Sequence, residues 1–126
     1  MIAPQELRQN NLIRDIESGR IGAVLTIGEK KCTIKMPYSK LSQSYEEFEP
    51  IELTEHWLLK FGFEHTTPDG WLCLNICNYW TFLYWQKGLL ELSVNRHSVV
   101  LQKILYVHQL QNIFFDFTGE ELKIKE

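Results

Sequence analysis

The sequence has few of the features that mark catalysis, metal binding or membrane insertion. Its three cysteines are an odd number without a CxxC pair, which argues against a disulfide framework or a zinc ribbon. The four histidines form no HxH or HExxH motif, and neither a Gly-rich phosphate loop nor a GxSxG elbow occurs. No apolar run approaches the roughly 18 residues that cross a bilayer. We therefore expect a noncatalytic cytoplasmic protein with no metal, no cofactor and no membrane association.

Positive charge is also scarce. Thirteen Lys and Arg residues stand against 16 Asp and Glu residues, giving a net charge of −3, and no more than two basic residues are adjacent. Because a nonspecific grip on a phosphate backbone requires a concentrated positive field, nucleic-acid binding is not expected. Residues 1–40 do carry a small excess of basic side chains. A small anion-binding surface is therefore compatible with this segment.

The first 50 residues predict a β-meander followed by a connection. Three runs rich in β-branched residues, NLIRD, RIGAVLTI and KCTIKM, are separated by turns that contain glycine. We expect a twisted antiparallel sheet over about 10–36, with an SH3-like arrangement as one candidate. Residues 37–50 combine two prolines with Ser and acidic residues and show no clean period, which is typical of an exposed connection. Function could reside in this loop.

Residues 51–126 predict an α+β core. A helix of about two turns is expected after Thr54, which can cap its first turn, and before Gly62. Four strand-like runs follow, WLCLNIC, YWTFLYWQ, LLELSV and SVVLQKI. Apolar residues at spacings of three and four over 106–118, with Gly119 after them, predict an amphipathic C-terminal helix packed on the sheet. The fold class is thus α+β, and 1–126 is expected to be a single domain.

Three segments carry a resemblance to a known family. IELTEHWLLKFGF in the middle of the chain and YVHQLQNIFFDFTGEEL near its end resemble the paired signatures of a small uncharacterised protein family of Bacteroidetes genomes, prophages and phages. The segment Leu7 to Asn11 is similar to the family's LRxGN motif, with Gln9 or Asn10 in place of the usual Gly. The resemblance implies a mobile-element setting, in which small acidic proteins often bind a host molecule rather than catalyse a reaction.

Aromatic and amide residues gather after residue 70. Trp and Tyr offer flat faces for stacking, Asn can pair with a base edge, and Arg can clamp a phosphate. This is the composition of a nucleotide pocket, although large aromatic residues that alternate along antiparallel strands more often form core and partner interfaces. The candidate ligand-binding residues are Trp71, Asn75, Asn78, Tyr79, Trp80, Tyr84, Arg96 and His97.

Both faces of residues 80–85 are apolar, which requires cover on both sides. A helix can cover one face, and a second subunit or the N-terminal sheet can cover the other, so a homodimer is plausible.

Three hypotheses about function follow. The first is a noncatalytic phage or mobile-element binding protein that sequesters a nucleotide-like host ligand or docks on a host protein. The second is an SH3-like nucleic-acid or protein adaptor, in which Lys30, Lys31 and Lys35 would face phosphates. The third and weakest is a hydrolase that uses His65 or His97 with a carboxylate.

Overall fold

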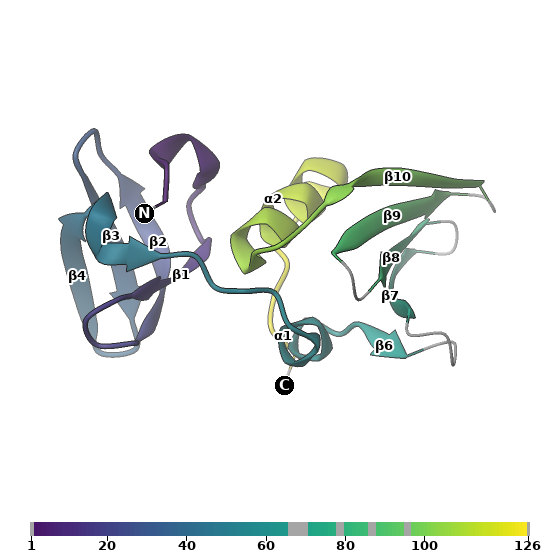
Figure 1. Ribbon diagram of the computed structural model, residues 1–126, viewed down its shortest axis with the longest axis horizontal. Coiled ribbons are helices and arrows are strands. Elements are labelled where there is room, and N and C mark those ends of the chain that lie inside the picture. Colours follow the sequence, from purple (N-terminus) through teal and green to yellow (C-terminus); the bar gives the residue numbers. More distant parts are fainter. Residues whose placement is uncertain (1, 66–70, 78–79, 86–87, 95–96, 126) are drawn as a thin grey trace. The chain divides into compact units, whose positions relative to one another are not determined.

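A computed structural model of the chain describes residues 2–65, 71–77, 80–85, 88–94 and 97–125 (Figure 1). These residues form an α+β fold, with ten antiparallel strands in two five-stranded sheets and two α-helices. The chain divides into two compact units. We call residues 2–52 with 106–122 the N-terminal unit, and residues 53–105 with 123–125 the central unit.

The N-terminal unit contains a curled sheet with strand order β4-β3-β2-β1-β5 (Figure 1). Its strands are β1 (Leu12–Asp15), β2 (Ile21–Ile27), β3 (Lys31–Met36), β4 (Ser39–Ser44) and β5 (Phe48–Glu49). Short 3-10 helices precede β1 and β5, at Pro4–Glu6 (η1) and Tyr45–Glu47 (η2). The last strand, β5, follows the 3-10 turn η2 and pairs with the first strand, β1, so the sheet curls into a half-barrel. The predicted N-terminal meander is confirmed.

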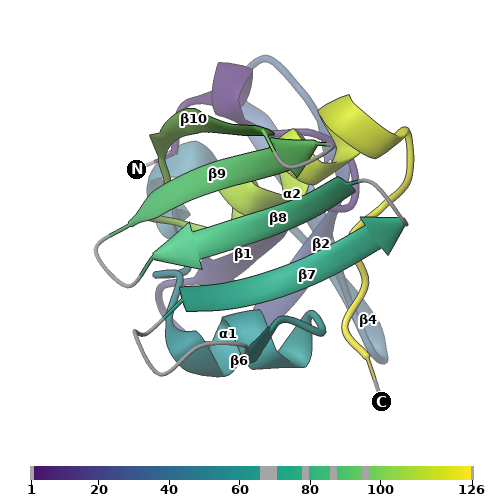
Figure 2. The ribbon, with the colours of Figure 1, turned by 90° about the vertical axis from the view of Figure 1, so that its right-hand side faces the viewer.

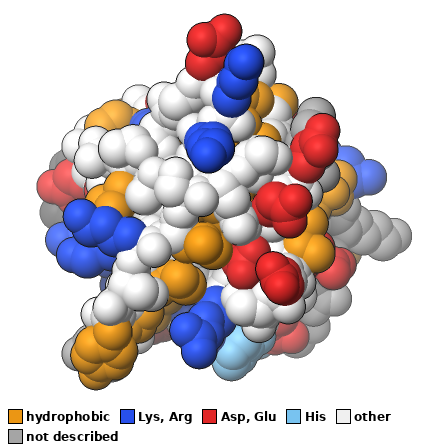
Figure 3. Space-filling model, turned by 90° about the vertical axis from the view of Figure 1, so that its left-hand side faces the viewer, with side chains coloured by type: hydrophobic (Ala, Val, Ile, Leu, Met, Phe, Trp, Pro, Cys, Tyr) orange, Lys and Arg blue, Asp and Glu red, His pale blue; other side chains and the backbone are white. Residues whose placement is uncertain are grey.

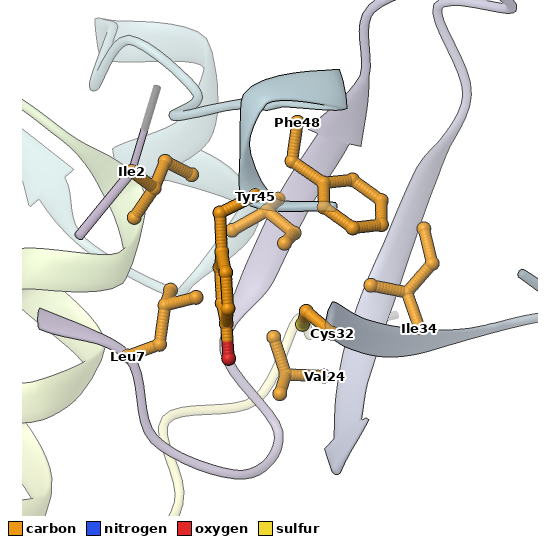
Figure 4. Packing of buried hydrophobic residues seen from close by; sticks show 8 residues of the cluster. Ile2, Leu7, Val24, Cys32, Ile34, Tyr45 and Phe48 are labelled. Carbon is orange, nitrogen blue, oxygen red and sulfur yellow. The ribbon is translucent and has the colours of Figure 1, made fainter. Parts of the chain in front are cut away.

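The concave side of this sheet holds a small hydrophobic core (Figure 4). Alternate residues of β1, β2 and β3 point into it, as the period of two requires. The core consists of Ile2, Leu7, Ile13, Val24, Cys32, Ile34, Tyr45 and Phe48. Met36 and Leu41 pack against it from the sheet margin.

The prediction that residues 37–50 form an exposed connection is wrong. β4 pairs with β3 at six consecutive positions, from Lys31 opposite Ser44 to Met36 opposite Ser39. Leu41 is the one apolar residue of β4, so the strand lacks the alternating pattern by which sequence reveals a half-buried strand. Backbone hydrogen bonds to β3 stabilise β4, and such bonds produce no pattern of apolar residues in the sequence.

The segment that resembles the LRxGN motif does form a tight turn. Asn10 has φ of 76°, and its N–H donates to the Val24 carbonyl at 2.8 Å. Asparagine tolerates this left-handed conformation better than other non-glycine residues do, which explains how the turn persists without glycine.

Helix α2 (Val107–Thr118) belongs to the N-terminal unit and contacts β1. The helix ends at Gly119, whose φ of 73° provides the left-handed C-cap. Gln111 is buried and connects the helix to the start of β1, because its Oε1 accepts from the Leu12 N–H at 2.8 Å. The predicted C-terminal helix is confirmed, and it contacts the N-terminal sheet through β1.

The central unit contains helix α1 (Glu55–Lys60) and a second sheet with strand order β10-β9-β8-β7-β6 (Figure 2). Its strands are β6 (Glu64–His65), β7 (Trp71–Cys77), β8 (Trp80–Trp85), β9 (Leu89–Val94) and β10 (His97–Lys103). Thr54 caps α1 by accepting from the Trp57 N–H at 3.4 Å, and Gly62 follows the helix with φ of 97°. No helix in the described part of the chain is long and apolar enough to cross a membrane.

Candidate functional site

The residues predicted to bind a ligand do not converge on one pocket. Asn78, Tyr79 and Arg96 lie outside the described residues. The other five lie on the sheet of the central unit, where alternation and register divide them between its two faces. Trp71 and Asn75 share one face, whereas Trp80, Tyr84 and His97 belong to the other.

The face that carries Tyr84 is largely buried. Tyr84 itself is 5% exposed and donates a hydrogen bond to the Ile104 carbonyl at 3.3 Å. Burial raises the pKa of its hydroxyl. This side chain therefore serves the core. His97 is exposed on the edge strand β10. It is paired with Val94 of β9, which in turn is paired with half-buried Trp80 of β8, so Val94 lies between His97 and Trp80.

The face that carries Trp71 is more open. The rings of Trp71 and Trp85 lie directly across the β7–β8 ladder, with centroids 4.9 Å apart and planes tilted by 45°. Both side chains are half-buried, and exposed Asn75 accepts a hydrogen bond from the Thr81 hydroxyl at 2.9 Å. A flat apolar ligand can stack on this Trp pair, with polar groups available further along the same face.

A second candidate site lies on the N-terminal unit, at the turn between β3 and β4. Pro37 and Tyr38 form a two-residue turn between paired Met36 and Ser39. The proline ring fixes φ near −65° at the first turn position and thereby holds the turn in one geometry. Tyr38, at the second position, is fully exposed at 102%. A tyrosine ring held entirely in water is uncommon in a folded domain, because Tyr is usually at least partly buried.

Two open pockets adjoin this turn. One, of about 400 Å³, is lined by Arg20, Ile21 and the four residues from Met36 to Ser39. The other, of about 450 Å³, is lined by the six residues from Lys35 to Lys40. The two pockets share the turn, and Tyr38 lines both of them. We call this region the hairpin surface; its residues are Arg20, Ile21, Lys35, Met36, Pro37, Tyr38, Ser39 and Lys40.

The hairpin surface is basic. Lys35 and Lys40 are direct cross-strand partners, a position at which like charges repel. Arg20 lines the pocket beside them. Within the described ranges, none of these three cations forms an ion pair and no acidic side chain lines either pocket. Figure 3 shows basic side chains beside exposed hydrophobic ones on this unit. An anionic group bound here would relieve the repulsion.

A hydrogen-bonded turn positions Arg20. The Asp15 carboxylate accepts from the Ser18 hydroxyl and from the Gln43 amide, both at 2.6 Å. The Arg20 carbonyl in turn accepts from the Asp15 N–H at 2.8 Å. Hydrogen bonds from Ser18 and then Gln43 hold the pKa of the Asp15 carboxyl below its usual range. Buried Asp15 thus connects the β1–β2 turn to β4 and fixes the backbone that carries Arg20.

The histidines occupy separate surroundings. His65 Nε2 lies 2.5 Å from Glu55 Oε1, and both side chains are 49% exposed, so the pair connects the start of α1 to β6 at the surface. His108 is 1% exposed and stacks on Tyr106 at a centroid distance of 5.9 Å. Burial lowers the pKa of His108. Among the described residues, no group of three His, Cys, Asp or Glu side chains is arranged to hold a metal.

No protein-family model, curated protein or solved structure matches this chain.

Sequence reasoning identified part of the hairpin surface and missed its centre. It anticipated that Lys35 would face an anion, and Lys35 is exposed. It did not single out Tyr38 or Arg20, because residues 37–50 lacked a strand pattern and Arg20 lies at least 15 residues before the segment from Lys35 to Lys40. A Pro-Tyr dipeptide between two runs that each carry a lysine was the available signal.

Proposed function

We propose that this protein is a noncatalytic binding protein whose N-terminal unit docks an acidic segment of a protein partner at the hairpin surface. The observation that carries the proposal is the fully exposed Tyr38, which lines one open pocket with Arg20 and a second with Lys35 and Lys40. Exposed aromatic and Arg side chains that can become desolvated on binding are the residues that most often dominate interface energetics.

The composition of the surface favours a peptide over a nucleic acid. Ile21, Met36 and Pro37 give the pocket an apolar lining that suits an aliphatic or aromatic side chain. Three cations suit a segment with two or three carboxylates, whereas affinity for a phosphate backbone depends on many such contacts. A partner of this kind would offer one hydrophobic anchor flanked by Asp or Glu, and electrostatic complementarity would set its orientation.

A displayed library of random peptides tests the proposal. We expect wild-type protein to select peptides that combine an aromatic or aliphatic anchor with flanking acidic residues. Tyr38→Ala should weaken their binding by about 2 kcal/mol, roughly thirtyfold in Kd, without altering the stability of the unit. The double variant Lys35→Glu with Lys40→Glu should abolish the preference for peptides with acidic residues.

Matched controls separate the site from general effects. Lys103→Glu makes, on the central unit, the charge change of either single lysine substitution; Lys103 is exposed, and its replacement should leave peptide binding unchanged. Peptides that bind Tyr38→Ala as tightly as wild type would contradict the proposal. Binding to single-stranded oligothymidylate that falls steeply with salt would instead favour the nucleic-acid adaptor.

A second candidate function is the sequestration of a nucleotide-like ligand on the open face of the central sheet. The Trp71–Trp85 pair favours it, because paired aromatic rings form a stacking platform for a base. Native mass spectrometry of the purified protein would reveal a retained ligand of nucleotide mass, and Trp71→Ala should remove it. A bare protein mass, with no quenching of Trp fluorescence by added nucleotides, would contradict this candidate.

The biological setting is part of the first proposal. A phage or prophage origin and action on a host molecule rest on the resemblance of the three segments to the family, and a cytoplasmic location rests on the absence of a long apolar run from the sequence. A partner captured from a bacterial host would support this setting only if its binding requires Tyr38.

A further inference from the structure

Three of the four edges in the two sheets are protected against pairing with another chain. The edge strands β5 and β6 contain two residues each. β4 is longer, but it is polar except for Leu41 and carries Lys40. Short length and charged or polar side chains are the usual means by which proteins prevent edge-to-edge association.

The fourth edge, β10, lacks this protection. It is seven residues long, and no strand of the described chain pairs with its outer side (Figure 2). Val99 and Val100 are 58% and 54% exposed, which makes them the most exposed aliphatic side chains among the described residues. Because successive residues of a strand point to opposite faces, this edge is apolar on both faces of the sheet.

Val99 ends an apolar row of the sheet, and Val100 ends a row on the opposite face in which Glu91 lies between it and Leu83. Val99 is aligned with Leu92, which in turn is aligned with Phe82, and both of these are buried. Val100 is aligned with Glu91, which is aligned with half-buried Leu83. A strand added outside β10 would continue both rows and cover the exposed valines, in addition to satisfying the free backbone groups of the edge.

We propose that β10 pairs antiparallel with β10 of a second copy of this chain. The strand sequence is HSVVLQK, with polar residues at both ends and apolar residues in the centre, so its pattern is symmetric about Val100. A two-fold axis near Val100 therefore places apolar residues opposite apolar residues, as an isologous contact requires. An unrelated partner would have no reason to match this symmetry.

The bulge between Val100 and Gln102 bends the strand within the contact. It limits the length of regular pairing, so the dimer is weak and depends on concentration. The contact lies in the central unit and uses no residue of the hairpin surface, so the two proposals stand or fall separately.

Sedimentation equilibrium across a range of protein concentrations tests the inference. Wild-type protein should show reversible formation of a dimer. Val100→Lys, and separately Val99→Lys, should shift the equilibrium to monomer, because a buried lysine on this edge opposes pairing. Ile16→Lys is the matched control: Ile16 is 50% exposed on the N-terminal unit, and its replacement should leave dimer formation unchanged.

Hydrogen exchange gives a second readout that does not depend on the variants. Amides of β10 should exchange more slowly as protein concentration rises, whereas amides of the edge strand β4 should not change. A wild-type monomer at all soluble concentrations would overturn the inference. So would a dimer that persists in both lysine variants, or a monomer whose β10 instead pairs with added strand peptides of other sequence.

Discussion

Replacing Arg8 should destabilise the N-terminal unit substantially, although Arg8 lies outside its strands. The guanidinium forms two hydrogen bonds to the Glu121 carboxylate, one from Nη1 to Oε1 and one from Nη2 to Oε2 at 3.1 Å. Its carbon lies 4.1 Å from the centre of the Phe115 ring. Arg8 thus joins the start of the chain to the end of α2, across 113 residues of sequence.

The magnitude follows from these contacts. Charge-assisted hydrogen bonds contribute about 1.5–3 kcal/mol and a partly exposed cation–π contact about 0.5–1 kcal/mol. The Arg8 and Glu121 side chains are 25% and 24% exposed, so solvent screening reduces the contribution of the charge-assisted hydrogen bonds. Arg8 Nε is buried without a hydrogen-bond partner in the described part of the chain, and the cost of burying it further lowers the net stabilisation by Arg8. We expect Arg8→Ala to cost about 2 kcal/mol, and Arg8→Lys to recover little, because Lys cannot form the bidentate pair.

The assay must report on the N-terminal unit alone. All four Trp residues lie in the central unit, so Trp fluorescence would miss the effect. Hydrogen exchange of the β1, β2 and α2 amides measures the opening free energy of the N-terminal unit directly. Arg14→Ala is the control, because the Arg14–Glu49 pair spans 3.5 Å with side chains 35% and 42% exposed, and such surface pairs contribute little. An Arg8→Ala effect no larger than that of Arg14→Ala would refute the reasoning.

Three further predictions concern single residues of the same unit. The pKa of Asp15 is lowered in the folded state, so ionised Asp15 stabilises the fold. This stabilisation is fully present above the unfolded pKa of about 3.8 and is lost as pH falls through the folded pKa. Urea titrations should therefore show the difference between wild type and Asp15→Asn shrinking in acid. The pKa of His108 is lowered by burial, so the unfolded chain binds the additional proton and stability falls as pH drops below about 6.5. His108→Phe should remove that loss. Because Asn10 has positive φ, Asn10→Ala should cost about 1 kcal/mol and Asn10→Gly almost nothing in hydrogen-exchange stability.

The sequence was most informative where a structural signal is local. The cap at Thr54 and the glycine at 62 defined α1 within a few residues, and the stripe before Gly119 defined α2. Four of the five strands of the central sheet, β7 to β10, were predicted in order, because their alternation and turn residues lie within about ten residues of each other; the two-residue strand β6 was not predicted. These features depend on neighbours in the chain, and one sequence is sufficient to recognise them.

Other features were decided by contacts between distant residues. β4 forms because β3 offers backbone hydrogen bonds, and α2 contacts β1, whose residues lie about 100 positions earlier. The residues of the predicted aromatic site lie on two faces of the central sheet, because successive residues of a strand point to opposite faces. Tyr84 is buried on one face, and half-buried Trp71 lies on the other.

For this protein, then, the sequence alone determined the α+β class, most of the strands and both helices, since local periodicity and capping encode them. The tertiary structure alone brought Arg20 beside the Met36 to Ser39 turn and left Tyr38 in solvent. It also placed β10 at an open edge of its sheet. Strand order and burial arise from long-range pairing, and no short window of sequence contains them.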